Sequence, residues 1–221
     1  MPGFRRPLLL LLLLATPAAA QVGHPPERSP YRDIDLYAAL APQVSLVGGS
    51  GGFLGVVPNS GLLYGLRAEI LANRPITIGI EFAYGQLERL IIQLDSTVSG
   101  PVRHGYGMVG ANIFLNLTGG KTWRRLAPYV GGGTGVAFAS HPPADTSGYK
   151  YGVKFYFAPT AGVRAFVTPD VYLRIEARSQ FVSIGYPDSY RARILAGGPG
   201  KEWVTTGIYT VSLGFPFPRL F

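Results

Sequence analysis

Charged and apolar residues alternate in the segment VYLRIEARSQF (171–181), where Arg174, Glu176 and Arg178 occupy every second position. A period of two predicts a β-strand with one polar face and one apolar face. Guanidinium and carboxylate groups that share a face can form two-point ion pairs. The chemistry of this face therefore depends on whether it meets water, lipid or a closed interior.

Nucleophilic and metal chemistry have little support in the sequence. The three histidines (His24, His104 and His141) lack metal-ligand spacing, and there is no cysteine. Ser140 and His141 are adjacent on an expected loop, but covalent catalysis needs a nucleophile and a base within reach of each other. The GGGTG segment (131–135) lacks the following lysine and helix of a phosphate loop. We therefore expect no catalytic, cofactor or metal site and no nucleic-acid partner, with a lipid A-modifying enzyme as a disfavoured alternative.

The first twenty residues have the layout of a secretory signal peptide. Arg5 and Arg6 precede an unbroken leucine run (8–14), and three alanines end at Ala20. The run is shorter than the roughly 20 residues that a membrane-spanning helix needs. We expect cleavage after Ala20, an uncleaved anchor being the alternative, followed by a flexible leader (21–34) and one domain (35–221). The mature chain keeps eighteen basic and twelve acidic residues.

Eight strand-like runs follow, in a chain with thirty glycines and nineteen prolines. Their length suits tilted membrane strands. Pro42 and Pro159 fall inside runs, where we expect bulges, and Pro128 is expected to begin its strand. The predicted strands are 36–47, 62–72, 76–86, 105–117, 127–139, 154–168, 171–183 and 203–217.

The connections between these strands alternate in length. The short ones cover 73–75, 118–125 and 169–170, and the long ones cover 48–61, 87–104, 140–153 and 184–202. Outer-membrane barrels have short periplasmic turns and longer outside loops. The fold class predicted is all-β, an eight-stranded antiparallel up-and-down transmembrane β-barrel.

The polar face is expected to point into this barrel, although a soluble lipocalin-like barrel has the same pattern inverted. Eight strands enclose a space that small and polar side chains fill, and that a full set of large aliphatics would overfill. The chain has sixteen arginines and four lysines, and arginine suits paired charges in a confined interior. The predicted lumen charge network comprises Arg67, Glu69, Glu81, Arg164, Arg174, Glu176 and Arg178.

Three segments resemble the bacterial outer-membrane β-barrel domain family, the OmpA-like barrels: LAPYVGGGTGVAF (126–138), APTAGVRAFVTPDVYLRIEAR (158–178) and YTVSLGFPFPRLF (209–221). The resemblance implies a location in the cell outer membrane and a terminal aromatic residue recognised by the barrel assembly machinery. Phe221 fits that signal. Because Pro216 and Pro218 interrupt the last strand, Phe215 or Phe217 is the alternative carrier.

Aromatic residues near strand ends predict an interfacial girdle at the lipid headgroups. Cationic loop residues predict contacts with lipopolysaccharide phosphates, with a solvated loop as the alternative. The function expected is a non-enzymatic outer-membrane barrel with a structural or surface-interaction role and a charge-plugged lumen. The alternatives are a narrow channel or carrier for small apolar solutes and a soluble binder, and the oligomeric state is open. The girdle residues are Tyr84, Trp123, Tyr129, Tyr172 and Trp203, and the loop cations are Lys150, Lys154, Arg191, Arg193 and Lys201.

Overall fold

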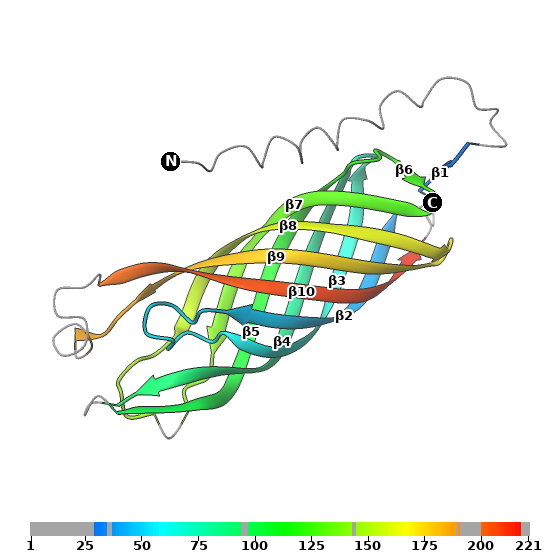
Figure 1. Cartoon of the computed structure of the whole chain (residues 1–221). Coiled ribbons are helices and arrows are strands. Elements are labelled where there is room, and N and C mark those ends of the chain that lie inside the picture. Colours follow the sequence, from blue (N-terminus) through cyan, green and yellow to red (C-terminus); the bar gives the residue numbers. More distant parts are fainter. Residues whose placement is uncertain are drawn as a thin grey trace, which may run out of the picture.

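Eight long antiparallel strands form a closed barrel (Figure 1). The computed structural model describes residues 29–34, 37–93, 97–142, 145–188, 190 and 200–217. The predicted signal peptide (1–20) lies outside these residues. The barrel strands are β2 (Ala38–Gly49), β3 (Ser60–Asn73), β4 (Ile76–Ile92), β5 (Val98–Asn116), β7 (Leu126–Ala139), β8 (Gly152–Thr168), β9 (Val171–Gly185) and β10 (Lys201–Phe217).

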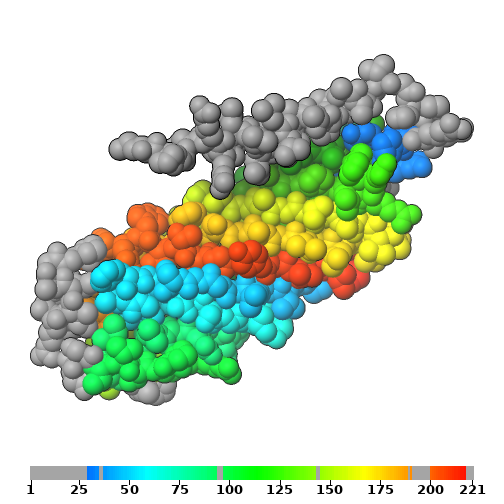
Figure 2. All heavy atoms as spheres, viewed as in Figure 1, coloured from blue at the N-terminus to red at the C-terminus, as the bar shows by residue number. Residues whose placement is uncertain are grey.

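Each barrel strand pairs with its neighbours in the chain, and β10 closes the ring against β2. The closing ladder runs from Thr206 opposite Gly49 to Phe217 opposite Ala38. β10 and β2 lie side by side in Figure 2, in red and blue. The predicted eight-stranded up-and-down barrel is therefore confirmed.

No helix in the described part of the chain is long and apolar enough to cross a membrane.

The short and long connections lie at opposite ends of the barrel (Figure 1), which we call the short-turn end and the loop end. One predicted loop is wrong, because most of 87–104 is strand: β4 continues to Ile92 and β5 begins at Val98. Leu87 and Ile91 are each 1% exposed, with their side chains packed inside the barrel. Burial of these apolar side chains extends the hairpin beyond the predicted bounds.

The strand prolines do not produce the bulges predicted at Pro42 and Pro159. The register of β2 with β10, and of β8 with β9, is the same before and after each proline. Each proline keeps its partner on the other side, Leu66 for Pro42 and Gly132 for Pro159. A missing N–H therefore interrupts pairing on one side without adding a residue to the strand. Pro128 is the third residue of β7, near its start as predicted.

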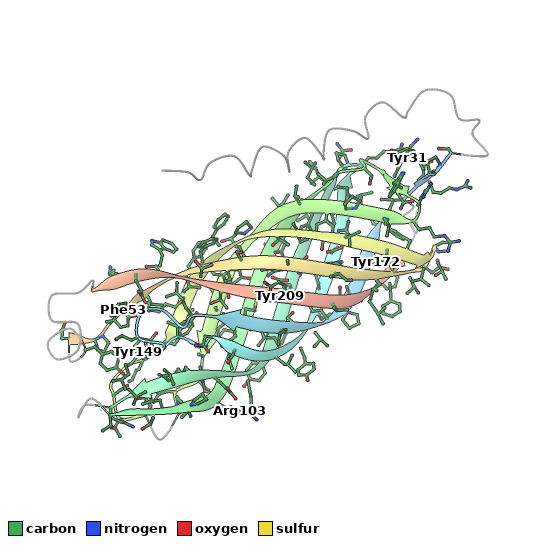
Figure 3. All side chains as sticks on the ribbon, in the orientation of Figure 1. Tyr31, Phe53, Arg103, Tyr149, Tyr172 and Tyr209 are labelled. Atoms are coloured by element: carbon green, nitrogen blue, oxygen red, sulfur yellow. The ribbon has the colours of Figure 1, made fainter. Side chains whose placement is uncertain are left out.

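Side chains alternate between the two faces of the wall as predicted. In β4, Ile80 and Phe82 are 66% and 49% exposed, whereas Glu81 and Ala83 are 3% and 2% exposed. Tyr209 on β10 shows the same outward direction in Figure 3. The outer surface is a band of large apolar residues, and the polar residues of the strands lie inside.

A two-stranded ribbon lies outside the barrel at the short-turn end. β1 (Tyr31–Asp33) pairs antiparallel with β6 (Lys121–Trp123). β6 then turns directly into β7. The predicted flexible leader (21–34) therefore ends in a strand, because its last residues add to the edge of β6; its residues up to 28 lie outside the described part. The predicted turn 118–125 likewise contains β6.

Candidate functional site

Glu176 on β9 lies at the centre of a buried set of ion pairs. Arg67 Nη1 on β3 is 2.7 Å from Glu176 Oε2, and Arg67 Nη2 also donates to Glu176 Oε1 at 2.9 Å. Arg67 Nη2 donates to Glu81 Oε2 at 2.7 Å, and Arg178 donates to both Glu81 and Glu176. The Tyr129 hydroxyl donates to Glu176 Oε2 at 2.7 Å. Charge-assisted bonds of this number fix the positions of all these side chains.

Glu69 on β3 is the centre of a second group nearer the short-turn end. Arg174 Nη1 lies 2.7 Å from Glu69 Oε1, and Arg164 Nη2 lies 3.2 Å from Glu69 Oε2. The Tyr172 hydroxyl accepts a hydrogen bond from Arg174 at 2.8 Å and donates one to Glu69 at 3.3 Å. Arg67 Nη1, 3.8 Å from Glu69 Oε1, joins this group to the first.

All seven charged residues selected from the sequence come together in this interior. They lie on β3, β4, β8 and β9, and none is more than 4% exposed. Four cations face three anions, so most of each charge is compensated by a partner at contact distance. Such compensation is what makes buried charges tolerable, since an unpaired charge in a low-dielectric interior is very costly.

The girdle assignment is wrong for two of the five residues. Tyr129 and Tyr172 are 1% and 0% exposed and hydrogen-bond inside the barrel. The alternation pattern carried the signal, because Tyr172 is two residues from Arg174 and so shares its face. Tyr84, Trp123 and Trp203 do face outward, at 49%, 43% and 69% exposed, and their girdle role stays a prediction.

The loop-side half of the interior contains a cluster of apolar and aromatic side chains, which strand periodicity alone does not predict. Tyr106, Met108 and Tyr156 lie on the loop side of the ion-pair groups. Val56 and Tyr149 of the same cluster belong to the connections and not to the strands. Large aromatic side chains therefore share the interior with the charged residues, at the short-turn end as Tyr129 and Tyr172 and at the loop end as Tyr106 and Tyr156. Connections that fold into the mouth bury their own apolar side chains there, and strand periodicity does not report this.

An ion pair in the mouth anchors the connection between β7 and β8. Arg89 on β4 pairs with Asp145, and the Ser147 amide donates to Asp145 Oδ1 at 2.9 Å. Burial acts to raise the pKa of the Asp145 carboxyl, but the Ser147 hydrogen bonds and Arg89 outweigh it and hold that pKa below its usual value. The Arg89 guanidinium lies 5.3 Å from the centre of the Tyr149 ring, which stacks with Tyr190. Figure 3 shows Tyr149 at the loop end.

The residues considered for catalysis are not arranged as a catalytic group. Ser140 Oγ accepts from the Gly105 amide at 2.8 Å, and His141 Nε2 lies 3.1 Å from the Asp145 carbonyl oxygen. His104 is 6% exposed inside the barrel and, among described residues, bonds to no serine. The described ranges also contain no cluster of three or more metal-ligating side chains.

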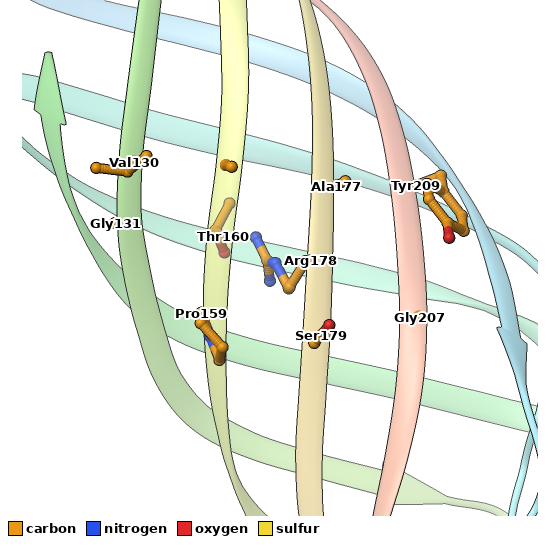
Figure 4. A pocket seen from close by; sticks show the side chains of 10 residues that line it. Val130, Gly131, Pro159, Thr160, Ala177, Arg178, Ser179, Gly207 and Tyr209 are labelled. Carbon is orange, nitrogen blue, oxygen red and sulfur yellow. The ribbon is translucent and has the colours of Figure 1, made fainter. Parts of the chain in front are cut away.

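A hollow of about 460 Å³ interrupts the outer wall beside Pro159. Small residues of β8, β9 and β10 form it, including Ala161, Ala177 and Gly207. Arg178 appears behind the gap between β8 and β9 in Figure 4. The β8–β9 ladder lacks its pairs at Ala158 and Pro159, so this is a local weakness of the wall.

The residues considered as an assembly signal lie at the end of β10. Phe215 and Phe217 are 42% and 45% exposed on the outer face. Phe221 lies outside the described residues.

Comparison with solved structures finds similar barrels at low sequence identity. Neisserial surface protein A is 15% identical with a TM-score of 0.53, covering 86% of this chain and 98% of its own. The outer membrane protein OprG from Pseudomonas aeruginosa is 12% identical with a TM-score of 0.52, covering 86% and 100%. Outer Membrane Protein W of E. coli is 16% identical with a TM-score of 0.50, covering 82% and 98%.

No protein-family model and no curated protein sequence matches the chain. The structural likeness nevertheless agrees with the resemblance found in the sequence. The chain has the fold of the eight-stranded outer-membrane β-barrels.

Proposed function

We propose that the chain is a non-enzymatic protein of the bacterial outer membrane, with a lumen closed to solutes and a loop end that serves as its interaction surface. The observation that carries this is the opposition of the two faces. Residues such as Ile80 and Ile113 are 66% and 59% exposed, while Arg67 and Arg174 are 0% exposed inside. A continuous apolar exterior of this kind is unfavourable in water, whereas it is stable in contact with the hydrocarbon core of a membrane.

Closure of the lumen is supported by two successive layers. The ion-pair groups around Glu176 and Glu69 occupy the short-turn half. The layer that contains Tyr106, Met108 and Tyr156 occupies the loop-side half. A solute would have to break several charge-assisted bonds and displace packed aromatic rings. A barrel of eight strands has little interior space beyond its own side chains.

Two consecutive residues of β10 give a matched test of the face assignment. Val211 is 50% exposed and Ser212 is 2% exposed, and the natural chain has no cysteine to interfere. Nitroxide labels on Val211→Cys and Ser212→Cys are placed in the protein refolded into vesicles. The label at 211 should collide with membrane-dissolved oxygen, and the label at 212 should be shielded from it. Equal oxygen collision at both positions, or the reverse order, contradicts the membrane assignment.

Planar-bilayer recording tests the closed lumen separately. The inserted protein is expected to give no resolvable single-channel steps in 1 M salt. Heat-dependent gel migration of the same sample reports that the protein is folded. Stable channel steps from folded protein contradict closure without affecting the membrane assignment.

A carrier for small apolar solutes is the second candidate, and the hollow beside Pro159 favours it. A solute leaving the barrel sideways would pass where the β8–β9 ladder is interrupted. Ala177→Phe fills this hollow, and Ala111→Phe on the outer face of β5 is its control. If the protein accelerates entry of an apolar dye into vesicles and only Ala177→Phe abolishes this, the carrier replaces the closed barrel.

The proposal includes two partners, lipopolysaccharide at the loop end and the barrel assembly machinery at the last strand. Lys150 and Lys201 are exposed at the loop end, where their charge suits lipopolysaccharide phosphates. Arg191 and Arg193, which were grouped with them from the sequence, lie outside the described residues. Phe215 and Phe217 are proposed as the aromatic signal that the assembly machinery recognises. Phe217→Ala should slow membrane insertion when the assembly machinery is present and should not change spontaneous insertion into vesicles without it.

A further inference from the structure

A hollow of about 300 Å³ lies at the short-turn end, between the β1–β6 ribbon and the end of β8. The ribbon is held by backbone bonds, from the Arg124 amide to the Pro30 carbonyl at 2.8 Å and from the Ile34 amide to the Gly120 carbonyl at 3.0 Å. Figure 3 places Tyr31 of β1 at this end. The hollow is thus a built part of the fold and not a gap between loose segments.

The rim of this hollow carries two arginines and one carboxylate, and its floor is apolar. Arg32, Arg125 and Asp33 are exposed residues of the rim, which therefore has a net positive charge. Phe166 and Ile34 form the floor, where they pack against the buried pair Ala39 and Tyr172. A ligand that fits both parts has an anionic head and an apolar body.

The turn between β6 and β7 holds arginine where the backbone does not favour it. Arg124 and Arg125 have φ values of 49° and 70°, in the left-handed region. A two-residue turn of this kind normally carries Asn-Gly or Asp-Gly, because other side chains strain there. The turn places Arg125 at the rim of the hollow and Arg124 against the Trp123 ring, and residues held in such conformations often serve function.

Positive charge is concentrated at this end of the described chain. The acids on the described residues there are Asp33 and Asp170, and none of the described ion pairs involves a cation of this end. The Arg124 guanidinium lies 5.3 Å from the Trp123 ring, which is 43% exposed on the outer face. Trp beside a cation is typical of the headgroup level of a membrane. The five cations at this end are Arg32, Arg74, Lys121, Arg124 and Arg125.

We propose that this hollow binds the headgroup phosphate of an anionic phospholipid in the periplasmic leaflet. The guanidinium groups of Arg32 and Arg125 donate hydrogen bonds to the phosphate oxygens, as guanidinium groups do with phosphate in general. The acyl chains continue along the outer wall past Val167, which is 59% exposed next to the floor. The inference rests on the proposed membrane location.

Native mass spectrometry of the folded protein, released from detergent with added lipid, tests this site. Wild type should retain phosphatidylglycerol in preference to phosphatidylcholine. The double variant Arg32→Gln and Arg125→Gln should lose about thirtyfold in phosphatidylglycerol affinity, the effect expected of two cations at an anionic surface. Arg103→Gln at the loop end, where the Arg103 side chain is 73% exposed, is the matched control and should leave that affinity unchanged.

A second variant separates binding from folding. Arg124→Asn with Arg125→Gly suits the left-handed turn and should raise the unfolding midpoint while weakening phosphatidylglycerol retention.

Competition with inorganic phosphate identifies the source of the anion. Displacement of the lipid by equimolar phosphate overturns the lipid assignment, as does equal loss of lipid in Arg103→Gln and the double variant. A protein that inserts into vesicles yet shows no preference refutes the site alone, whereas failure to insert refutes the proposed function.

Discussion

Arg67 Nη1 lies 2.7 Å from Glu176 Oε2, although the two residues are 109 positions apart in the chain. They belong to β3 and β9, which have β2 and β10 between them in the wall. The pair therefore connects two separated parts of the barrel through its interior. The same Glu176 carboxylate also bonds to Arg178 and Tyr129, so one residue holds side chains from three strands.

Removing the charge of Glu176 should strongly destabilise the barrel. Glu176→Gln leaves the buried Arg67 and Arg178 with less compensation, and we expect a loss of about 3–5 kcal/mol. Unfolding by guanidinium in vesicles measures it. Glu88→Gln is the matched control, because its partner Arg103 is largely exposed and such a pair contributes about 0–1 kcal/mol. Equal losses in the two variants would contradict the importance of the interior network.

Lysine should not replace Arg67, even though it keeps the charge. Arg67 donates to Glu81 and Glu176 through Nε, Nη1 and Nη2, and a single ammonium cannot reach both carboxylates in that geometry. Arg67→Lys should cost at least about 2 kcal/mol, the value of one or two lost bonds to charged groups. The unfolding midpoint measures this, with Arg103→Lys expected to stay near wild type. A midpoint unchanged in Arg67→Lys would show that charge alone matters.

Gly214 should not tolerate a methyl group. A Cβ built there lies 1.9 Å from Cζ of Tyr172, the residue directly opposite on β9. Gly214→Ala must displace the ring and with it the bonds to Arg174 and Glu69, so we expect a loss of about 1–3 kcal/mol. Gly48→Ala is the control, since nothing lies within 4 Å of its Cβ position. A Gly214→Ala protein as stable as Gly48→Ala would mean that the ring moves freely.

The wall of the barrel could be predicted because a strand repeats every two residues. Glu81 was assigned to the inner face with the help of that period, and it is 3% exposed, whereas its neighbour Ile80 is 66% exposed on the other face. The eight strand-like runs gave the strand number, and the alternation of short and long connections gave the two ends. The same period placed Tyr129 and Tyr172 inside, but their position near strand ends outweighed it in the girdle assignment. The error came from preferring a positional tendency to a geometric rule.

The partners within the interior could not be predicted in the same way. Arg67 reaches Glu176 because barrel curvature and strand stagger bring β3 and β9 face to face, and neither quantity can be read from one strand. The mouth is harder still, since Asp145 and Tyr149 come from a connection without a repeat. Their place is set by Arg89, whose own strand extends into what the sequence suggested was a loop.

Acidification should release the connection that Asp145 anchors. The pKa of Asp145 is lowered in the folded protein, so its contribution to stability is present above the unfolded value of about 4 and is lost as pH falls through the folded value. Protonation removes the pair with Arg89 and weakens the bond from the Ser147 amide. Hydrogen exchange of that amide, corrected for its intrinsic pH dependence, should show protection at pH 7 that declines below about pH 4.

Two variants identify the carboxylate responsible for this pH dependence. Asp145→Asn should lower Ser147 protection at pH 7 and abolish its dependence on pH, because the neutral side chain cannot pair with Arg89 at any pH. Asp170→Asn, in the short turn between β8 and β9, should leave both unchanged, since it lies at the opposite end of the barrel. If Asp145→Asn kept the wild-type decline, another carboxylate would control the mouth, and the Arg89–Asp145 pair would not be what holds this connection in place.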